Sequence, residues 1–185
     1  LIGQNGGAEF YSSNCISEVV NCTYSGNDAL NNGGAQAFDP CCALTVRQSS
    51  YLGNTSGMDG GGLYVWFDCD VDINDSTFED NQSLLAIIGS GGAIYGGGIY
   101  DFGTLRYYNG GTLHVRNSEF WRNTAAFGGG LYWYGDEADI RIFDCLLRDN
   151  TAEYGGAMYW SGGAPTISTC SIRGNTAKGA DHYDS

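Results

Sequence analysis

The stretch that decides the fold runs from Val115 to Tyr159 and reads VRNSEFWRNTAAFGGGLYWYGDEADIRIFDCLLRDNTAEYGGAMY. It contains one pattern twice. An apolar residue, a small residue, another apolar residue, an asparagine and a run of glycines appear in the first half, and the second half repeats them in the same order and at the same spacing. A constant separation across so many positions indicates one structural unit repeated along the chain.

Carried outward, the template finds one asparagine in each of six copies. These asparagines are Asn27, Asn54, Asn81, Asn123, Asn150 and Asn175. Their spacing is nearly constant, and only the interval from Asn81 to Asn123 is irregular, because it is longer than the others by about half a period. The residues three and eight before each asparagine are all apolar. The residues five before it are all small, which suits an inward position with little room: Cys22, Ser49, Ser76, Ser118, Cys145 and Cys170.

The pattern predicts an all-β chain. Apolar or small positions alternate with polar ones over part of each copy, and glycines punctuate every copy, so helices are not expected. A unit of about 27 residues is long enough for three short strands and three turns. We expect a parallel β-helix, a solenoid that forms a single domain over residues 1–185, in which each copy makes one circuit of the coil. About seven circuits at roughly 4.8 Å each would make a rod roughly 35 Å long. The long interval predicts an insertion around residues 84–112.

The asparagines are expected to form a ladder. Asparagine tolerates the left-handed turn conformation, and identical amides in adjacent circuits can hydrogen-bond along the axis. Two of them, Asn54 and Asn81, also lie in glycosylation sequons, but a ladder position should bury the amide and leave it unmodified. The other two sequons, at Asn21 and Asn74, fall on strand positions beside the small column. These are the better glycosylation candidates.

Two short motifs resemble a known family. Phe78-Glu79-Asp80-Asn81 and Phe120-Trp121-Arg122-Asn123 match F-x-x-N, and Gly91-Gly92-Ala93-Ile94 matches G-G-A-I. This pairing is similar to the repeats of chlamydial polymorphic outer membrane proteins and related passengers. The resemblance implies a right-handed parallel β-helix and an extracellular adhesin.

Seven cysteines in 185 residues predict an oxidising compartment, and therefore a secreted or cell-surface protein. Cys15, Cys42 and Cys69 are spaced by one period of the repeat and should lie one above another, where neighbours are close enough for a disulfide. Cys41 competes with Cys42 for a partner. The further pair Cys145 and Cys170 is open to either a disulfide or two buried thiols.

Tyrosines follow the glycine run at matching positions. Strand alternation places them opposite the aliphatic Leu63, Ile99, Leu131 and Met158, so they are expected to form an outward stripe. The stripe comprises Tyr64, Trp66, Tyr95, Tyr100, Tyr132, Tyr134 and Tyr159. An exposed aromatic stripe could stack on sugar rings or on another protein. The alternative is that the tyrosines only stabilise the sheet, as cross-strand aromatics do.

The formal net charge of −13, from 21 acidic and eight basic residues, argues against nucleic acid or an anionic membrane as a partner. Membrane insertion is not expected either. Calcium is the one cofactor that the sequence allows: Asp68, Asp70 and Asp72 alternate along one strand and could hold it weakly, although such clusters are more often a solvated face. The nearest approach to a lyase acid–base pair is Arg141 near Asp139, and the Gly-His-Gly and Arg-x-Lys phrases of polysaccharide-cleaving β-helices are absent.

The chain begins and ends at almost the same phase of the repeat, with Gly6-Gly7-Ala8 echoed by Gly179-Ala180. We expect the protein to associate with itself, either laterally or head to tail, and copies that stack end to end would form a fibre. An excised fragment of a longer β-helix would show the same ends. The sequence therefore predicts a non-enzymatic extracellular structural or adhesive β-helix. The alternatives are a glycan-binding module that uses the tyrosine stripe, and a polysaccharide lyase or hydrolase.

Overall fold

The computed structural model describes residues 3–66, 69–84, 99–102, 111–134, 139–161 and 164–179. Within these ranges the chain forms 25 β-strands and no helix. It follows that no helix in the described part has the length and apolar character that a membrane crossing requires. The predicted all-β class is confirmed.

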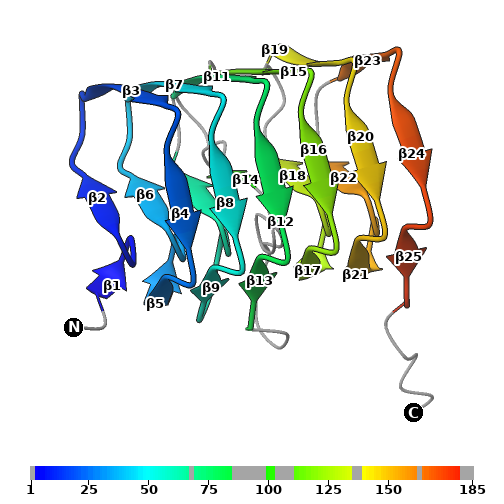
Figure 1. The fold of residues 1–185 in the computed structure, drawn as a ribbon, viewed down its shortest axis with the longest axis horizontal. Coiled ribbons are helices and arrows are strands. Elements are labelled where there is room, and N and C mark those ends of the chain that lie inside the picture. Colours follow the sequence, from blue (N-terminus) through cyan, green and yellow to red (C-terminus); the bar gives the residue numbers. More distant parts are fainter. Residues whose placement is uncertain are drawn as a thin grey trace.

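Each repeat contributes four short strands, one to each of four parallel sheets that run along the coil (Figure 1). We call them sheets A to D. Sheet A contains β1 (Gly3–Asn5), β5 (Asp28–Asn32), β9 (Thr55–Ser56), β13 (Gln82–Ser83), β17 (Thr124–Phe127), β21 (Thr151–Tyr154) and β25 (Thr176–Ala177). Sheet B contains β2 (Glu9–Tyr11), β6 (Gln36–Phe38), β10 (Leu63–Val65), β14 (Ile99–Phe102), β18 (Leu131–Tyr134) and β22 (Met158–Ser161). Sheet C contains β3 (Ile16–Val20), β7 (Ala43–Arg47), β11 (Asp70–Asn74), β15 (Thr112–Arg116), β19 (Asp139–Phe143) and β23 (Thr166–Ser168). Sheet D contains β4 (Thr23–Ser25), β8 (Ser50–Leu52), β12 (Thr77–Glu79), β16 (Glu119–Trp121), β20 (Leu146–Arg148) and β24 (Ser171–Arg173).

The solenoid and its period are as predicted, with two differences of detail. A repeat makes four strands instead of three, because it turns at four corners. Three sheets have six strands and one has seven, so the coil is slightly shorter than the seven circuits expected.

The period of the repeat sets the register of every sheet. Val46 lies opposite Ile73, and Ile73 lies opposite Val115 although the long interval separates them in the sequence. The insertion therefore adds chain without shifting the stacking. Of the predicted insertion over residues 84–112, most lies outside the described residues, which include only Leu84, β14 and residues 111–112.

The core is made of columns of like side chains, one side chain from each circuit. Val46, Ile73 and Val115 from sheet C are fully buried. On sheet D, the rings of Tyr51 and Phe78 stack with centroids 4.5 Å apart. Both predicted apolar columns thus line the interior, and each such side chain contributes about 1.5–3 kcal/mol through burial.

Candidate functional site

The predicted asparagine ladder is present and unbroken. The side-chain Nδ2 of Asn54 donates to Oδ1 of Asn81 at 2.9 Å, and its backbone N–H donates to the same oxygen at 3.0 Å. The second amide hydrogen goes to the backbone oxygen of Tyr24 at 3.0 Å. The same bonds cross the insertion, from Asn81 to Asn123. They link all six asparagines at the corner between sheets D and A.

We expected the ladder asparagines themselves to adopt the left-handed turn conformation, and this was wrong. The left-handed residue is the one before each ladder asparagine, for example Asp80 at φ 54° and Arg122 at φ 54°. This residue turns the corner, and the asparagine after it points inward. Asparagine is needed at that point because its amide pairs with a backbone N–H and a backbone oxygen of the preceding circuit and also donates to the asparagine of the following circuit.

The small column is a second ladder, which the sequence did not reveal. At the corner between sheets C and D, the backbone N–H of Ser49 donates to Oγ of Ser76 at 3.2 Å, and that of Ser76 donates to Oγ of Ser118 at 3.2 Å. Each hydroxyl donates in turn to a backbone oxygen two residues earlier. Serine, and cysteine at both ends of the column, are favoured because a short polar atom fits the corner and pairs there.

All seven cysteines carry free thiols, so none of the predicted disulfide pairs is joined. The predicted stacking is correct: the backbone N–H of Cys15 lies 3.4 Å from Sγ of Cys42, and that of Cys42 lies 3.2 Å from Sγ of Cys69. These sulfur atoms accept backbone hydrogen bonds instead of bonding to one another. Cys145 is buried, and burial raises the pKa of its thiol to about 12, which keeps it protonated and unreactive.

Cys170 is half-buried and Cys41 is exposed. The thiol of Cys170 donates to the backbone oxygen of Ser168 at 3.2 Å. It lies one circuit from Cys145, as expected for neighbours in the column. The pair is therefore two thiols and not a disulfide, but only Cys145 of the two is fully buried.

The predicted glycosylation candidates differ in exposure. Asn21 is exposed at a left-handed corner, and Asn74 is half-buried at the end of β11. Asn54 and Asn81 are fully buried in the ladder. Their amides are therefore closed to a glycan in the folded protein, whereas Asn21 is open to one.

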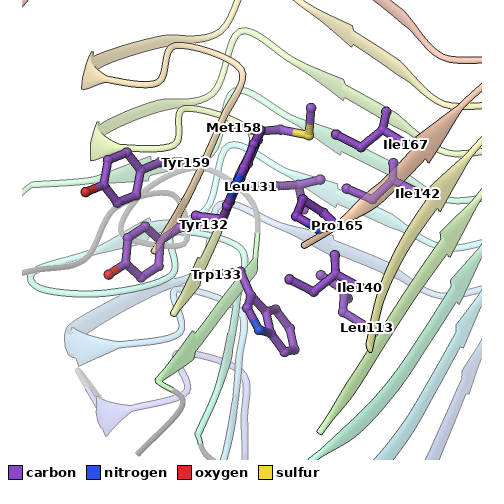
Figure 2. A pocket seen from close by; sticks show the side chains of 11 residues that line it. Leu113, Leu131, Tyr132, Trp133, Ile140, Ile142, Met158, Tyr159, Pro165 and Ile167 are labelled. Carbon is purple, nitrogen blue, oxygen red and sulfur yellow. The ribbon is translucent and has the colours of Figure 1, made fainter. Parts of the chain in front are cut away.

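The tyrosines share one column, as predicted, but they are not an exposed stripe. Tyr64, Tyr100, Tyr132 and Tyr159 are in register on sheet B. Figure 2 shows the rings of Tyr132 and Tyr159 on the opposite side of their strands from Leu131 and Met158. Their centroids lie 5.5 Å apart with the planes almost parallel. Yet Tyr64 is only 7% exposed and Tyr132 only 2%.

Packing from the neighbouring sheet A explains the burial of Tyr132. The glycines between β17 and β18 bring the ring of Phe127 edge-on against Tyr132 and Tyr159, with centroids 6.3 and 5.2 Å apart. Glycine is required at the turn, because a Cβ on Gly128 would collide with the backbone oxygen of Leu131. Of the remaining stripe residues, Trp66 is 38% exposed. Tyr95 lies outside the described residues, and Tyr134 is described only as part of β18.

The opposite side of β18 and β22 faces a small apolar cavity of about 20 Å³. Leu131 and Met158 approach Ile142 and Ile167 across it (Figure 2). The cavity has room for no more than one water molecule and is lined almost wholly by carbon, so it is a packing gap and carries no polar chemistry.

The predicted calcium site has no support among the described residues. Asp70 is exposed and Asp72 half-buried on the outer face of β11, while Asp68 lies outside the described ranges. No group of three or more metal-binding side chains gathers in the part of the chain that the structure describes. Asp70 instead accepts a hydrogen bond from Oγ1 of Thr112 at 2.9 Å.

Sheet C also carries the acid–base residues that the sequence singled out. Nε of Arg141 lies 2.8 Å from Oδ1 of Asp139, and Nε2 of His114 lies 3.6 Å from the other oxygen. Hydrogen bonding to Arg141 holds the pKa of Asp139 below its usual range. The structure thus places Arg141 beside Asp139, as predicted, and adds His114, which the sequence analysis did not connect to this pair.

A polar network inside the first two circuits was not predicted; Gln36 and Tyr51 are buried in it, and its other members are half-buried. Oε2 of Glu9 accepts hydrogen bonds from Tyr11 at 2.9 Å, from Tyr24 at 2.9 Å and from Nε2 of Gln36 at 2.5 Å. Tyr51 donates to Oε1 of Gln36. Burial raises the pKa of Tyr51 and of Tyr24, so both hydroxyls remain donors.

The signal for this network was present in the sequence. Glu9 and Gln36 stand where later repeats have Leu63 and Leu131. Tyrosines occupy the facing column on sheet D in the same two circuits, where phenylalanine follows later. Polar residues that replace apolar ones on two facing columns at once indicate a paired network.

Charged side chains surround Trp121 on the outer face of sheet D. The guanidinium of Arg148 lies 3.8 Å from the ring centroid and that of Arg122 lies 4.1 Å from it. Arg122 also forms ion pairs with Glu79 and Asp80. The ring of Trp121 is thus covered by two arginine side chains of the protein itself, so Trp121 is a packing residue.

A groove of about 370 Å³ lies at the outer corner between sheets C and D. No residue pattern in the sequence predicted it. Three consecutive circuits contribute the same positions, a left-handed corner residue and the first outward residue of the sheet D strand. Its exposed polar side chains are Asn117, Glu119, Asp144, Thr169, Ser171 and Arg173. This volume is in the range of small-molecule sites.

Comparison with known proteins supports the fold. Residues 38–185 match the family described as "Right handed beta helix region". No curated protein and no solved structure matches the chain. The family match supports the handedness that the sequence resemblance implied, while the resemblance to chlamydial surface proteins beyond the fold stays a prediction. Because the match covers well over half of the chain, the protein belongs to the right-handed β-helix family.

Proposed function

We propose that the protein is a non-enzymatic extracellular β-helix that acts as a structural or adhesive element. The observation that carries the proposal is the unbroken asparagine ladder. It joins every repeat from Asn27 to Asn175, even across the insertion. A coil whose circuits are hydrogen-bonded through both backbone and side chains resists bending, and a stiff rod displays its side faces at fixed spacing.

Charge and exposure support the extracellular part of the proposal. A net charge of −13 keeps such a rod soluble and disfavours anionic partners. Asn21, in a glycosylation sequon, is exposed at a corner, as a secretory route would require. The resemblance of the F-x-x-N and G-G-A-I motifs to surface passengers points the same way.

The environment of Asp139 argues against one enzymatic role, that of a general acid. Arg141 holds its pKa below the usual range, so the carboxyl is ionised near neutrality and cannot donate a proton as a general acid. This exposed ion pair suits a solvated surface better than a bond-cleaving site.

Bead adhesion tests the proposal. Beads coated with the folded protein should adhere to polysaccharide and mucin surfaces, and heat-unfolded protein should not. The same polymers are incubated with soluble protein and assayed for reducing ends and for unsaturated sugars. Adhesion without cleavage is the expected result. Cleavage would establish the lyase or hydrolase alternative, and failure to adhere to every surface would remove the adhesive role.

End-to-end association is the second part of the sequence-based proposal, and one feature favours it. Each ladder asparagine from Asn27 to Asn150 donates to the asparagine of the circuit that follows it in the chain, so the ladder has a direction and a second copy could extend it only head to tail. Sheet A has one strand more than the other sheets. Continuing all four sheets in register would therefore place β1 of one copy where β25 of the other lies, and one of the two strands must be displaced.

Sedimentation velocity over a wide concentration range tests this association. Species that grow with concentration, and filaments by electron microscopy, are expected. A monomer at the highest concentration would contradict fibre formation and leave adhesion by single rods.

A further inference from the structure

The groove between sheets C and D is formed by equivalent residues of three consecutive circuits. Its corner residues Asn117, Asp144 and Thr169 all have left-handed φ angles of 47° to 54°, so they project in the same way at successive levels. Adjacent levels are about 4.8 Å apart, and three levels therefore span about 10 Å. The groove matches the length of two linked sugar rings.

The groove offers both donors and acceptors that no other described residue uses. The side chains of Asn117, Glu119, Ser171 and Arg173 form no hydrogen bond or ion pair with the rest of the described chain. A carboxylate accepts hydrogen bonds from paired hydroxyls, and a guanidinium donates to hydroxyl and ring oxygens. Leu146, half-buried between the two ends, provides an apolar floor against which the C–H face of a sugar can pack.

Arg173 stands apart from the arginines beside it. Arg148 stacks on Trp121 and lies 3.4 Å from Asp149. Arg122 is held by two carboxylates. Arg173 follows Arg148 in the same sheet D column, but it is exposed and unpaired among the described residues, and it lines the groove. It is therefore the cation in this part of sheet D that is free for a ligand.

The charge balance of the groove selects the ligand class. Two carboxylates, from Glu119 and Asp144, face one cation, from Arg173. The local charge is negative, and so is that of the whole chain. Uronate or sulfated sugars would be repelled, while a neutral sugar can satisfy all three charged groups with its hydroxyls.

We propose that this groove is a binding site for neutral disaccharide units of a glycan. The site names the ligand class of the adhesive role proposed above, and in that sense it rests on that role. It also moves the glycan surface away from the sheet B tyrosines, of which Tyr132 and Tyr159 are packed against Phe127, to the outer corner of sheets C and D.

The experiment is an amide NMR titration of the folded protein with maltose, cellobiose and lactose, and with digalacturonate as an anionic counterpart. At least one neutral disaccharide at about 10 mM should shift the amides of residues 117–119 and 169–173. Glu119→Gln and Arg173→Gln should each weaken that binding by about tenfold, since each removes one charge-assisted hydrogen bond. Digalacturonate should bind more weakly than the neutral sugars.

The matched controls are Glu153→Gln on sheet A and Arg116→Gln on sheet C, which change charge by the same amount outside the groove and should leave the titration unchanged. No shift with any neutral disaccharide, shifts elsewhere on the rod, or binding unaffected by both groove variants would overturn the proposal. Disaccharide binding without bead adhesion would remove the adhesive role alone. Bead adhesion without amide shifts in the groove would rule out this binding site but not the adhesive role.

Discussion

The first two circuits and the circuits after the insertion share one backbone but fill it differently. The inner column of sheet B begins with Glu9 and Gln36 and ends with Leu131 and Met158. Its facing column on sheet D changes with it, from tyrosines that reach Gln36 to phenylalanine and leucine. The corners and the ladders therefore specify the coil. In the interior, the side chains on sheet B only have to match the polarity of the side chains that face them on sheet D.

A column on sheet A shows the same division. Asn32 and Asp59 occupy it before the insertion, and Phe127 and Tyr154 occupy it afterwards, with their rings stacked at 4.9 Å. Burial raises the pKa of Asp59 to about 7, whereas the half-buried Phe127 and the more exposed Tyr154 have no charge to desolvate. Two halves with one geometry thus respond differently to pH and to substitution.

The largest expected effect is common to both halves. Asn54→Ala and Asn150→Ala each remove two donors and one doubly used acceptor from a fully buried site. We expect each to lower the free energy of unfolding by about 4–5 kcal/mol, as measured by urea denaturation. Thr55→Ala, next to the ladder but outside it, should cost less than about 0.5 kcal/mol. Unequal losses for the two asparagines would show that the ladder depends on the interior of its half.

The second substitution introduces a glutamine, as at Gln36, into the next circuit, whose interior is apolar. Leu63 follows Gln36 in the sheet B column, and Phe78, at the facing position of its circuit, has no hydroxyl to offer. Leu63→Gln should therefore lower the free energy of unfolding by about 3–4 kcal/mol, because its amide is buried without partners. Leu63→Met, which conserves volume, should cost less than about 1.5 kcal/mol. A well-tolerated glutamine would mean that the interior does not need matched columns.

The third substitution breaks the polar network. Gln36→Leu leaves the hydroxyl of Tyr51 and one contact of Glu9 unsatisfied, and should lower the free energy of unfolding by about 2–3 kcal/mol. Adding Tyr51→Phe should recover part of this loss, because the pair then resembles the apolar circuits. A double-mutant cycle measures the coupling. Strictly additive losses would show that the two side chains act independently.

The smallest effect concerns pH. Because the pKa of Asp59 rises on folding from 3.8 to about 7, its protonated form stabilises the fold fully below pH 3.8. That contribution is lost as pH rises to about 7. A shift of about three units corresponds to at most about 4 kcal/mol, and we expect roughly half, because the side chain is partly open to water.

Asp59→Asn should therefore raise the free energy of unfolding by about 2 kcal/mol at pH 8 and change it little at pH 4. Urea denaturation at the two pH values measures the difference. Equal effects of the substitution at both pH values would show that the carboxyl titrates normally.

Much of the molecule could be predicted because its signals are periodic. The spacing of Asn54, Asn81 and their equivalents identified the stacked register, and the column of Val46, Ile73 and Val115 identified the core. The tyrosine column was aligned correctly but its exposure was wrong. Strand alternation tells which side of a sheet a residue faces, but it does not tell whether another sheet packs against that side, as Phe127 does.

The sequence by itself determined the period, the parallel stacking, the inward columns and the ladder positions. Each of these features depends on the number of residues between equivalent positions, and this number can be counted directly in the repeats. Only the tertiary structure decided that Tyr132 is buried, that Glu9 and Gln36 meet tyrosines inside the coil, and that three corners form a groove. These features depend on the angle between sheets and on contacts between residues far apart in one circuit. That angle is set at left-handed corner residues as different as Gly26, Asp80 and Arg122, so no residue pattern encodes it.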